Sequence, residues 1–154
     1  MIQLKGNLWQ FHSQGNWIVV PTNGCVKMTG ECVMGRGVAA QAKARFPGLP
    51  KLLGQALKGT GNQVYSFQAE RILSFPVKHN WWEMADLDLI RQSSIQLLTV
   101  VTTHKLPAVY LPQVGCGNGG LTWVQVEPEL GILDSRFHLV IFDPTPAKGA
   151  RIGK

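Results

Sequence analysis

The residues best suited to hold an anionic ligand form a glycine-rich segment at 115–120, in which four of the six positions are glycine. Glycine has no Cβ, so backbone N–H groups there can approach a ligand closely. A helix expected to begin at Trp123 would add the positive end of its dipole. The segment lacks the Lys-Ser/Thr of a Walker loop and the spacing of a dinucleotide fingerprint. It predicts an anion cradle, with a tight turn that binds nothing as the alternative.

A second glycine pair stands in Met34-Gly35-Arg36-Gly37-Val38, directly before another expected helix. Either segment alone is weak support for a ligand site. Two glycine loops that each open a helix, and that each lie near the end of a strand, can bracket a diphosphate between them. The pair therefore favours a ligand with a pyrophosphate, such as a nucleotide sugar.

Lys78 follows an expected strand and precedes His79 and the pair Trp81-Trp82. An amine is a nucleophile only in its neutral form, which burial or nearby cations favour. The neighbouring aromatic residues could supply that desolvation. The alternative is a surface lysine followed by two structural tryptophans.

The three cysteines predict neither disulfides nor a metal site. Their number is odd, which argues for a reducing compartment. Cys25, Cys32 and Cys116, taken with His79, do not reproduce a zinc spacing. Cys116 has no base evident in the sequence that would make it a nucleophile. We expect no metal and no cofactor.

Strand-like and helix-like segments alternate along the chain. Short apolar, β-rich runs predict strands, and longer segments with one apolar face predict helices. The expected strands are 2–4, 17–20, 71–77, 108–111 and 137–142, and the expected helices are 38–46, 86–104 and 123–133. This order predicts an α/β sandwich with a largely parallel central sheet. In such sheets the ligand lies beyond the carboxyl ends of the strands, so the segments 21–24, 78–82 and 112–120 and the residues 143–144 are the places to search.

Composition limits the broad class of protein. The 154 residues are 45% hydrophobic and 16% charged, which excludes disorder as the main state. We expect one domain at 1–146, a flexible basic tail at 147–154, and a monomer. No run of about 18 apolar residues and no secretion signal is evident, so we expect a cytoplasmic protein without membrane contact. The net charge of +6 favours anionic partners such as nucleic acid, with plain solubility as the alternative.

Several of these motifs together resemble the macrodomain family. They are Lys5-Gly6-Asn7-Leu8, the asparagine after the early strand, the segments 34–39 and 74–81, and the long glycine-rich segment 111–123. The subfamily they resemble contains the terminal ADP-ribose protein glycohydrolase and the antitoxin that removes ADP-ribose from DNA. The likeness covers roughly residues 2–144. It implies a three-layer α/β/α fold with a mixed, largely parallel sheet that binds ADP-ribose and hydrolyses ADP-ribosyl linkages.

The resemblance also implies roles for individual residues. Lys78 would attack the anomeric carbon of the distal ribose and form a covalent intermediate, and Asn23 would lie near that ribose. Asn7 would accept a hydrogen bond from the adenine amino group, and Phe142 would pack on adenine, with core packing as the alternative for Phe142. The implied ligand contacts are Asn7, Leu8, Met34, Gly35, Arg36, Gly37, Val38, Gly115, Cys116, Gly117, Asn118, Gly119 and Phe142.

One departure from the subfamily bears on the substrate. Protein-directed relatives carry an Asp in the second glycine loop, whereas this chain has Asn118-Gly119-Gly120, as the DNA-directed antitoxins have Gly-Gly. Their following Asp is Thr122 here, which we expect to cap a helix. Three functions remain open: an ADP-ribosyl glycohydrolase acting on DNA or protein, a non-catalytic ADP-ribose reader, and a phosphatase of ADP-ribose 1″-phosphate.

Overall fold

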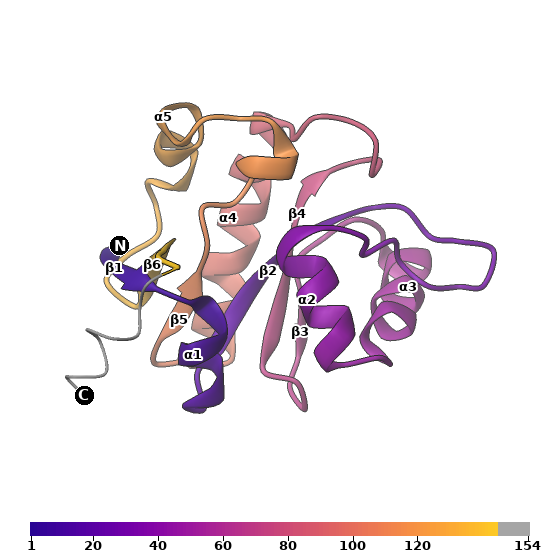
Figure 1. Ribbon diagram of the computed structural model, residues 1–154, viewed down its shortest axis with the longest axis horizontal. Helices are drawn as coiled ribbons and strands as arrows, with labels where there is room; N and C mark the ends of the chain where they lie inside the picture. The colour runs from indigo at the N-terminus through magenta and orange to yellow at the C-terminus, as the bar shows by residue number, and fades with distance from the viewer. Residues whose placement is uncertain (145–154) are drawn as a thin grey trace.

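A computed structural model describes residues 1–144 as a six-stranded sheet with helices on both faces (Figure 1). The strands are β1 (Ile2–Gly6), β2 (Trp17–Asn23), β3 (Tyr65–Phe67), β4 (Ile72–Lys78), β5 (Val109–Leu111) and β6 (Phe137–Phe142). The α-helices are α1 (Leu8–Ser13), α2 (Gly37–Arg45), α3 (Leu49–Thr60), α4 (Leu87–Thr103) and α5 (Trp123–Val126). Two 3₁₀ turns, η1 (Gly117–Gly119) and η2 (Glu127–Leu130), complete the described elements.

The sheet is mixed and mostly parallel, as the sequence predicted. Its strand order is β1-β6-β5-β2-β4-β3, and every neighbouring pair is parallel except β3 with β4. The central strand β2 lies between β5 and β4. Its carboxyl end is therefore flanked by the ends of two other strands, which is where an α/β sheet forms its ligand crevice.

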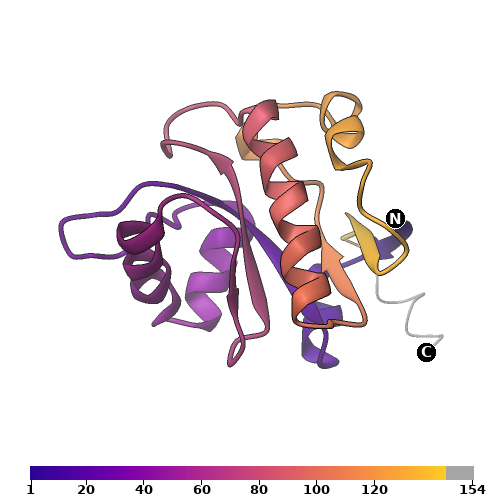
Figure 2. The same ribbon diagram turned by 180° about the vertical axis from the view of Figure 1, so that it is seen from behind.

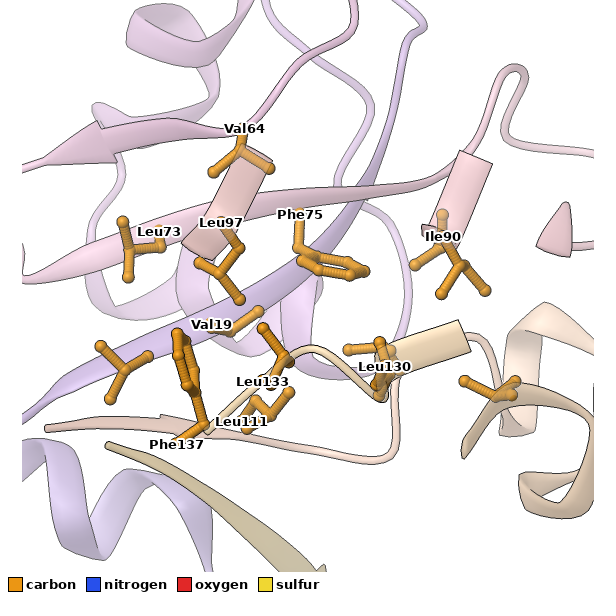
Figure 3. Packing of buried hydrophobic residues seen from close by; sticks show 14 of the residues in the cluster. Val19, Val64, Leu73, Phe75, Ile90, Leu97, Leu111, Leu130, Leu133 and Phe137 are labelled. Carbon is orange, nitrogen blue, oxygen red and sulfur yellow. The ribbon is translucent and has the colours of Figure 1, made fainter. Parts of the chain in front are cut away.

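Alternation along β2 separates the core into two layers. Val19 points to the face covered by α4, α5 and η2, where Leu97, Leu130 and Phe137 also pack (Figure 3). Ile18 and Val20 belong to the opposite cluster with α1, α2 and α3. Seen from behind, α4 crosses one face of the sheet while α2 and α3 lie beyond it (Figure 2). The predicted three-layer arrangement is confirmed.

The element ends follow from local chemistry. Asp86 caps α4 by accepting hydrogen bonds from the backbone N–H groups of Asp88 and Leu89. Thr122 caps α5 in a capping box with Gln125, as expected. The helix predicted over 123–133 is wrong in length, because Pro128 has no N–H to continue the α-helical ladder and the chain passes into η2.

Two α-helices and one strand were not predicted. They are α1, α3 and the antiparallel strand β3. The helix expected over 38–46 ends before Pro47-Gly48, but a new helix begins directly after this pair with Pro50 in its first turn, where proline is tolerated. The expected tail at 147–154 lies outside the described residues. Within residues 1–144, no helix is long and apolar enough to cross a membrane.

Candidate functional site

A cavity of about 650 Å³ opens at the carboxyl ends of β2, β4, β5 and β6. Its wall is formed by the residues that follow these strands and by the two glycine loops, 34–38 and 115–120. The predicted position of the site is the position of this cavity. Its volume lies within the range of roughly 300–1,000 Å³ that is usual for small-molecule sites.

The first glycine loop, residues 34–38, leads into α2. A Cβ placed on Gly35 would meet no atom within 4 Å, so the backbone there borders open space. Helix α2 begins at Gly37, and no side chain caps this end. A Cβ on Gly37 would lie 3.2 Å from Nδ2 of Asn118 in the second loop. The two loops therefore face each other, as a diphosphate bracket requires.

The second glycine loop, residues 115–120, is held in place by its neighbours. Gly115 has a φ of +79°, and a Cβ there would lie 2.7 Å from Cδ1 of Ile90 in α4. The carbonyl of Gly119 accepts a hydrogen bond of 2.8 Å from the N–H of Ala85. This loop is attached to α4 and to the segment that precedes it.

Lys78 is the last residue of β4 and lines the cavity. Its Nζ donates hydrogen bonds to the carbonyl oxygens of Trp81, at 3.3 Å, and of Asn118, at 3.1 Å. The second bond places the amine beside the second glycine loop. Lys78 thus places its amine at the junction of β4 and that loop.

Asn23 ends β2, and a register shift between Thr22 and Asn23 places it opposite Lys78. Its Nδ2 donates to the carbonyl of Val33 at 3.0 Å, and its Oδ1 accepts from the N–H of Cys25 at 2.9 Å. The side chain therefore joins the two ends of the loop between β2 and α2. Sγ of Cys32 also donates toward Oδ1, at 4.0 Å, and one amide hydrogen remains for a ligand.

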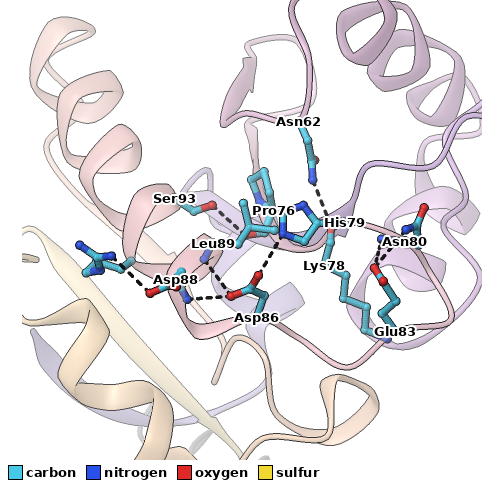
Figure 4. Close-up of polar contacts among 11 residues, drawn as sticks. Asn62, Pro76, Lys78, His79, Asn80, Glu83, Asp86, Asp88, Leu89 and Ser93 are labelled. Carbon is cyan, nitrogen blue, oxygen red and sulfur yellow. Dashed lines mark hydrogen bonds and ion pairs between the residues drawn. The ribbon is translucent and has the colours of Figure 1, made fainter.

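The segment 79–86 connects β4 to α4 and borders the site (Figure 4). His79 Nε2 lies 3.0 Å from Oδ2 of Asp86. This hydrogen bond, with those from the backbone N–H groups of Asp88 and Leu89, holds the pKa of the Asp86 carboxyl below its usual value. The Asp86 carboxylate thus holds both the histidine and the helix start in place.

Cysteine and metal chemistry gain no support from the structure. Burial, followed by the nearby Cys25, raises the pKa of the Cys32 thiol to about 12, and burial also raises that of Cys116. Neutral thiols are poor nucleophiles. In residues 1–144, no group of three His, Cys, Asp or Glu side chains could hold a metal ion.

Most of the residues predicted to form the site lie together around the cavity. They are Asn23, Gly35, Arg36, Gly37, Val38, Lys78, Gly115, Cys116, Gly117, Asn118, Gly119 and Phe142. Phe142 is 67% exposed, so its ring is not the ordinary core residue that the alternative interpretation supposed. An exposed ring at the cavity wall is free to stack on a ligand.

Three predicted residues lie outside the cavity lining. Asn7 caps α1 through a hydrogen bond of 2.9 Å from the N–H of Trp9, and Leu8 and Met34 are buried in the core. Asn7 follows Gly6, which pairs with Phe142 in the sheet, so it lies near that end of the cavity. Ligand contact by these three stays a prediction.

Eight residues of the lining were not predicted. They are Pro21, Thr22, Val33, Ala39, Val77, Trp81, Pro112 and Gln113. Five of them, Pro21, Thr22, Trp81, Pro112 and Gln113, stand in segments that the sequence had marked as strand ends, and that signal alone would have found them. Val33 had no such signal, because it depends on the bridge that folds the loop back at Val26 and Cys32.

The chain is similar to DNA ADP-ribosyl glycohydrolases, although no protein-family model matches it. It is 34% identical over 107 residues to those of Mycobacterium tuberculosis and Mycobacterium bovis, which is 64% of this chain and 30% of the relative. It is 26% identical over 127 residues to that of Thermus aquaticus, which is 76% of this chain and 35% of the relative. The chain therefore spans about a third of the length of these curated relatives.

Solved structures of related macrodomains superpose on this chain. The macrodomain of Mycobacterium tuberculosis DarG superposes with a TM-score of 0.68 at 27% identity and covers 84% of this chain and 90% of that one. Thermosipho africanus DarTG in complex with ADP-ribose has a TM-score of 0.73 at 21% identity, over 96% of this chain and 43% of that one. This chain is a macrodomain, and it is related to the macrodomains of the DarG DNA ADP-ribosyl glycohydrolases.

Proposed function

We propose that this macrodomain hydrolyses the bond between ADP-ribose and DNA, with Lys78 as the nucleophile. The observation that carries the proposal is the place of Lys78 Nζ at the cavity wall, 3.1 Å from the carbonyl of Asn118 in the second glycine loop. The shared description of the related proteins as DNA ADP-ribosyl glycohydrolases supports the reaction class and the substrate.

The residues that line the cavity indicate how ADP-ribose would be oriented in it. The diphosphate would lie between the glycine loops, where backbone N–H groups and the start of α2 favour negative charge. Phe142 would stack on adenine at the end formed by β6 and β1. The distal ribose would then lie toward Asn23 and Lys78, which are opposite each other at the ends of β2 and β4.

The reaction proceeds through two displacements at the anomeric carbon of that ribose. The neutral amine of Lys78 attacks this carbon, a new N–C bond forms, and the bond to DNA breaks. The departing DNA atom keeps the electron pair and takes a proton. Water then breaks the N–C bond, which releases ADP-ribose and restores the amine. To attack, Nζ must give up a proton and at least one of its two hydrogen bonds to carbonyl oxygens.

A lysine variant with a matched control tests the proposal. Lys78→Ala should lower the rate of ADP-ribose release from modified DNA by at least about a hundredfold, because the loss acts on the chemical step. Its calorimetric affinity for free ADP-ribose should stay within about threefold of the wild type. Lys78→Arg should also fail, since a guanidinium stays protonated. Lys43→Ala, an exposed lysine of α2 outside the cavity lining, should change neither quantity.

The same assay separates the other functions. ADP-ribosylated DNA, ADP-ribosylated protein and ADP-ribose 1″-phosphate are incubated side by side with the wild type. Tight binding of ADP-ribose without turnover of any of them would identify a reader. Release of phosphate alone would identify a phosphatase. Equal rates for Lys78→Ala and the wild type on DNA would contradict the covalent mechanism.

A further inference from the structure

Two indole rings stand exposed at the mouth of the cavity. Trp81 is 49% exposed and Trp82 is 64% exposed, and their rings meet edge to face with centroids 5.7 Å apart. Trp81 also lines the cavity, and Met84 of the same segment is 63% exposed. Adjacent exposed tryptophans are unusual in a soluble domain, because the burial of an indole is favourable. A contiguous apolar surface of this kind marks a binding site.

The segment that carries the indoles is fixed in position. The N–H and Nδ2 of Asn80 both donate to Oε1 of Glu83, at 2.9 and 3.1 Å, and the N–H of Glu83 donates back to the carbonyl of Asn80 at 3.2 Å (Figure 4). The N–H of Ala85 donates a hydrogen bond to the carbonyl of Gly119 in the second glycine loop. The rings are therefore presented on a rigid turn, and little conformational entropy would be lost when a ligand binds them.

The position of the turn relates the indoles to the reaction. The carbonyl of Trp81 is 3.3 Å from Nζ of Lys78. A carbon that this amine attacks lies in contact with Nζ, so the reacting end of the ligand lies at the end of the cavity that Trp81 lines. Whatever carries the ADP-ribose would then lie along Trp81 and Trp82. This step rests on the proposed function of Lys78.

The distribution of charged residues indicates which kind of ligand would bind the two indoles. Residues 24–60 carry six Lys or Arg and one acid, whereas residues 83–134 carry two Lys or Arg and six acids. Nζ of Lys51 and of Lys58 both lie within 4 Å of the point where a Cβ on Gly30 would stand, so positive charge gathers at the tip of the loop between β2 and α2. The start of that loop contacts the segment that carries the indoles, since the N–H of Gly24 donates to the carbonyl of His79 at 3.1 Å.

We propose that Trp81 and Trp82 form a stacking platform for the bases next to the ADP-ribosylated nucleotide, with the phosphates running toward the basic loop. Aromatic rings stack on any base, and the cations of that loop would hold the backbone. A base can stack on an indole only when it has left its own stack, so the platform selects an unpaired strand over a duplex. An exposed pair of indoles, on a turn joined to a basic loop, fits this ligand better than it fits an acidic peptide.

The test uses Trp82, which lies outside the cavity lining. Binding of an unmodified single-stranded oligonucleotide and of the matching duplex is measured by fluorescence anisotropy, and binding of ADP-ribose by calorimetry. Trp82→Ala should weaken single-strand binding by about fivefold or more and leave ADP-ribose affinity within about twofold. Trp82→Phe should keep most of the affinity, because its ring still stacks. Ile95→Ala, a half-exposed residue of α4 outside the cavity lining, serves as the control and should match the wild type.

The outcomes separate the platform from the proposed reaction. If the wild type binds the strand through Trp82 but releases no ADP-ribose, the platform stands and the hydrolase proposal fails. If Trp82→Ala binds the strand as the wild type does, the platform is wrong whatever the rates are. Equal binding of duplex and single strand would also overturn it. So would a change in molar mass by light scattering for Trp82→Ala, since the indoles would then join two copies of the chain.

Discussion

The glycine loops at 34–38 and 115–120 form opposite walls of the cavity, and their glycines have different neighbours. At Gly35 a Cβ would meet nothing within 4 Å, and its φ lies outside the positive range. At Gly115 the φ is +79°, and a Cβ would collide with Ile90 and approach Val126 and Ala85. The fold itself tolerates a side chain at Gly35 and does not tolerate one at Gly115.

This difference shows that glycine content alone is an ambiguous signal for a ligand site. At Gly115 the absence of a side chain lets the chain pack on α4, and a ligand is not needed to explain it. At Gly35 nothing in the protein fills the space, so the ligand is the remaining reason for glycine. Substitutions that separate stability from binding can test this comparison directly.

The largest expected effect is that of Gly115→Val on stability. The positive φ disfavours a β-branched residue, and the side chain would overlap Ile90. Together these effects should lower the free energy of unfolding by roughly 2–5 kcal/mol. Urea denaturation followed by circular dichroism measures the loss. An unchanged midpoint would contradict the packing role that we assign to this glycine.

Gly35→Val should show the opposite behaviour. Its unfolding free energy should stay within about 0.5 kcal/mol of the wild type, because the substitution meets no protein atom. Its affinity for ADP-ribose should fall more than tenfold, or about 1.4 kcal/mol, because the valine would occupy the space of the diphosphate. Gly48→Val is the matched control, since Gly48 also borders open space, has a φ of −84° and lies outside the cavity lining. Equal ADP-ribose affinity for all three proteins would remove the first loop from the site.

The sequence predicted the features that depend on local pattern. The strands at 17–20 and 137–142 are evident from their apolar, β-rich runs, and the position of the cavity follows from parallel strand order alone. Features that depend on distant contacts were not accessible. The packing of Gly115 on Ile90 joins residues that are far apart in the chain, and the attachment of Asn23 to Val33 depends on how a long loop folds back.

The comparison of the two loops can also be tested by changing the pH. Asp86 lies in the segment 79–86, which holds the second loop, and its pKa is clearly shifted. The hydrogen bond from His79, followed by backbone N–H groups at the start of α4, holds the pKa of its carboxyl below the ordinary value. A lowered pKa in the folded state means that the carboxylate stabilises the fold fully above the unfolded value of about 3.9. This contribution disappears as the pH falls through the lower, folded value.

Asp86→Asn should therefore remove this pH dependence with a small change in stability, the smallest effect of the series. Asparagine caps a helix about as well as aspartate, so the start of α4 should persist. The wild type should melt higher than the variant at pH 6, by at most a few degrees because the carboxylate is partly exposed. The difference should shrink as the pH falls from about 5 toward 3, since protonation turns the wild-type side chain into a neutral one. Thermal unfolding of both proteins at each pH measures it, and the other acids cancel because both proteins carry them. A difference that stays constant down to pH 3 would show that the ionised carboxylate does not hold this wall of the cavity.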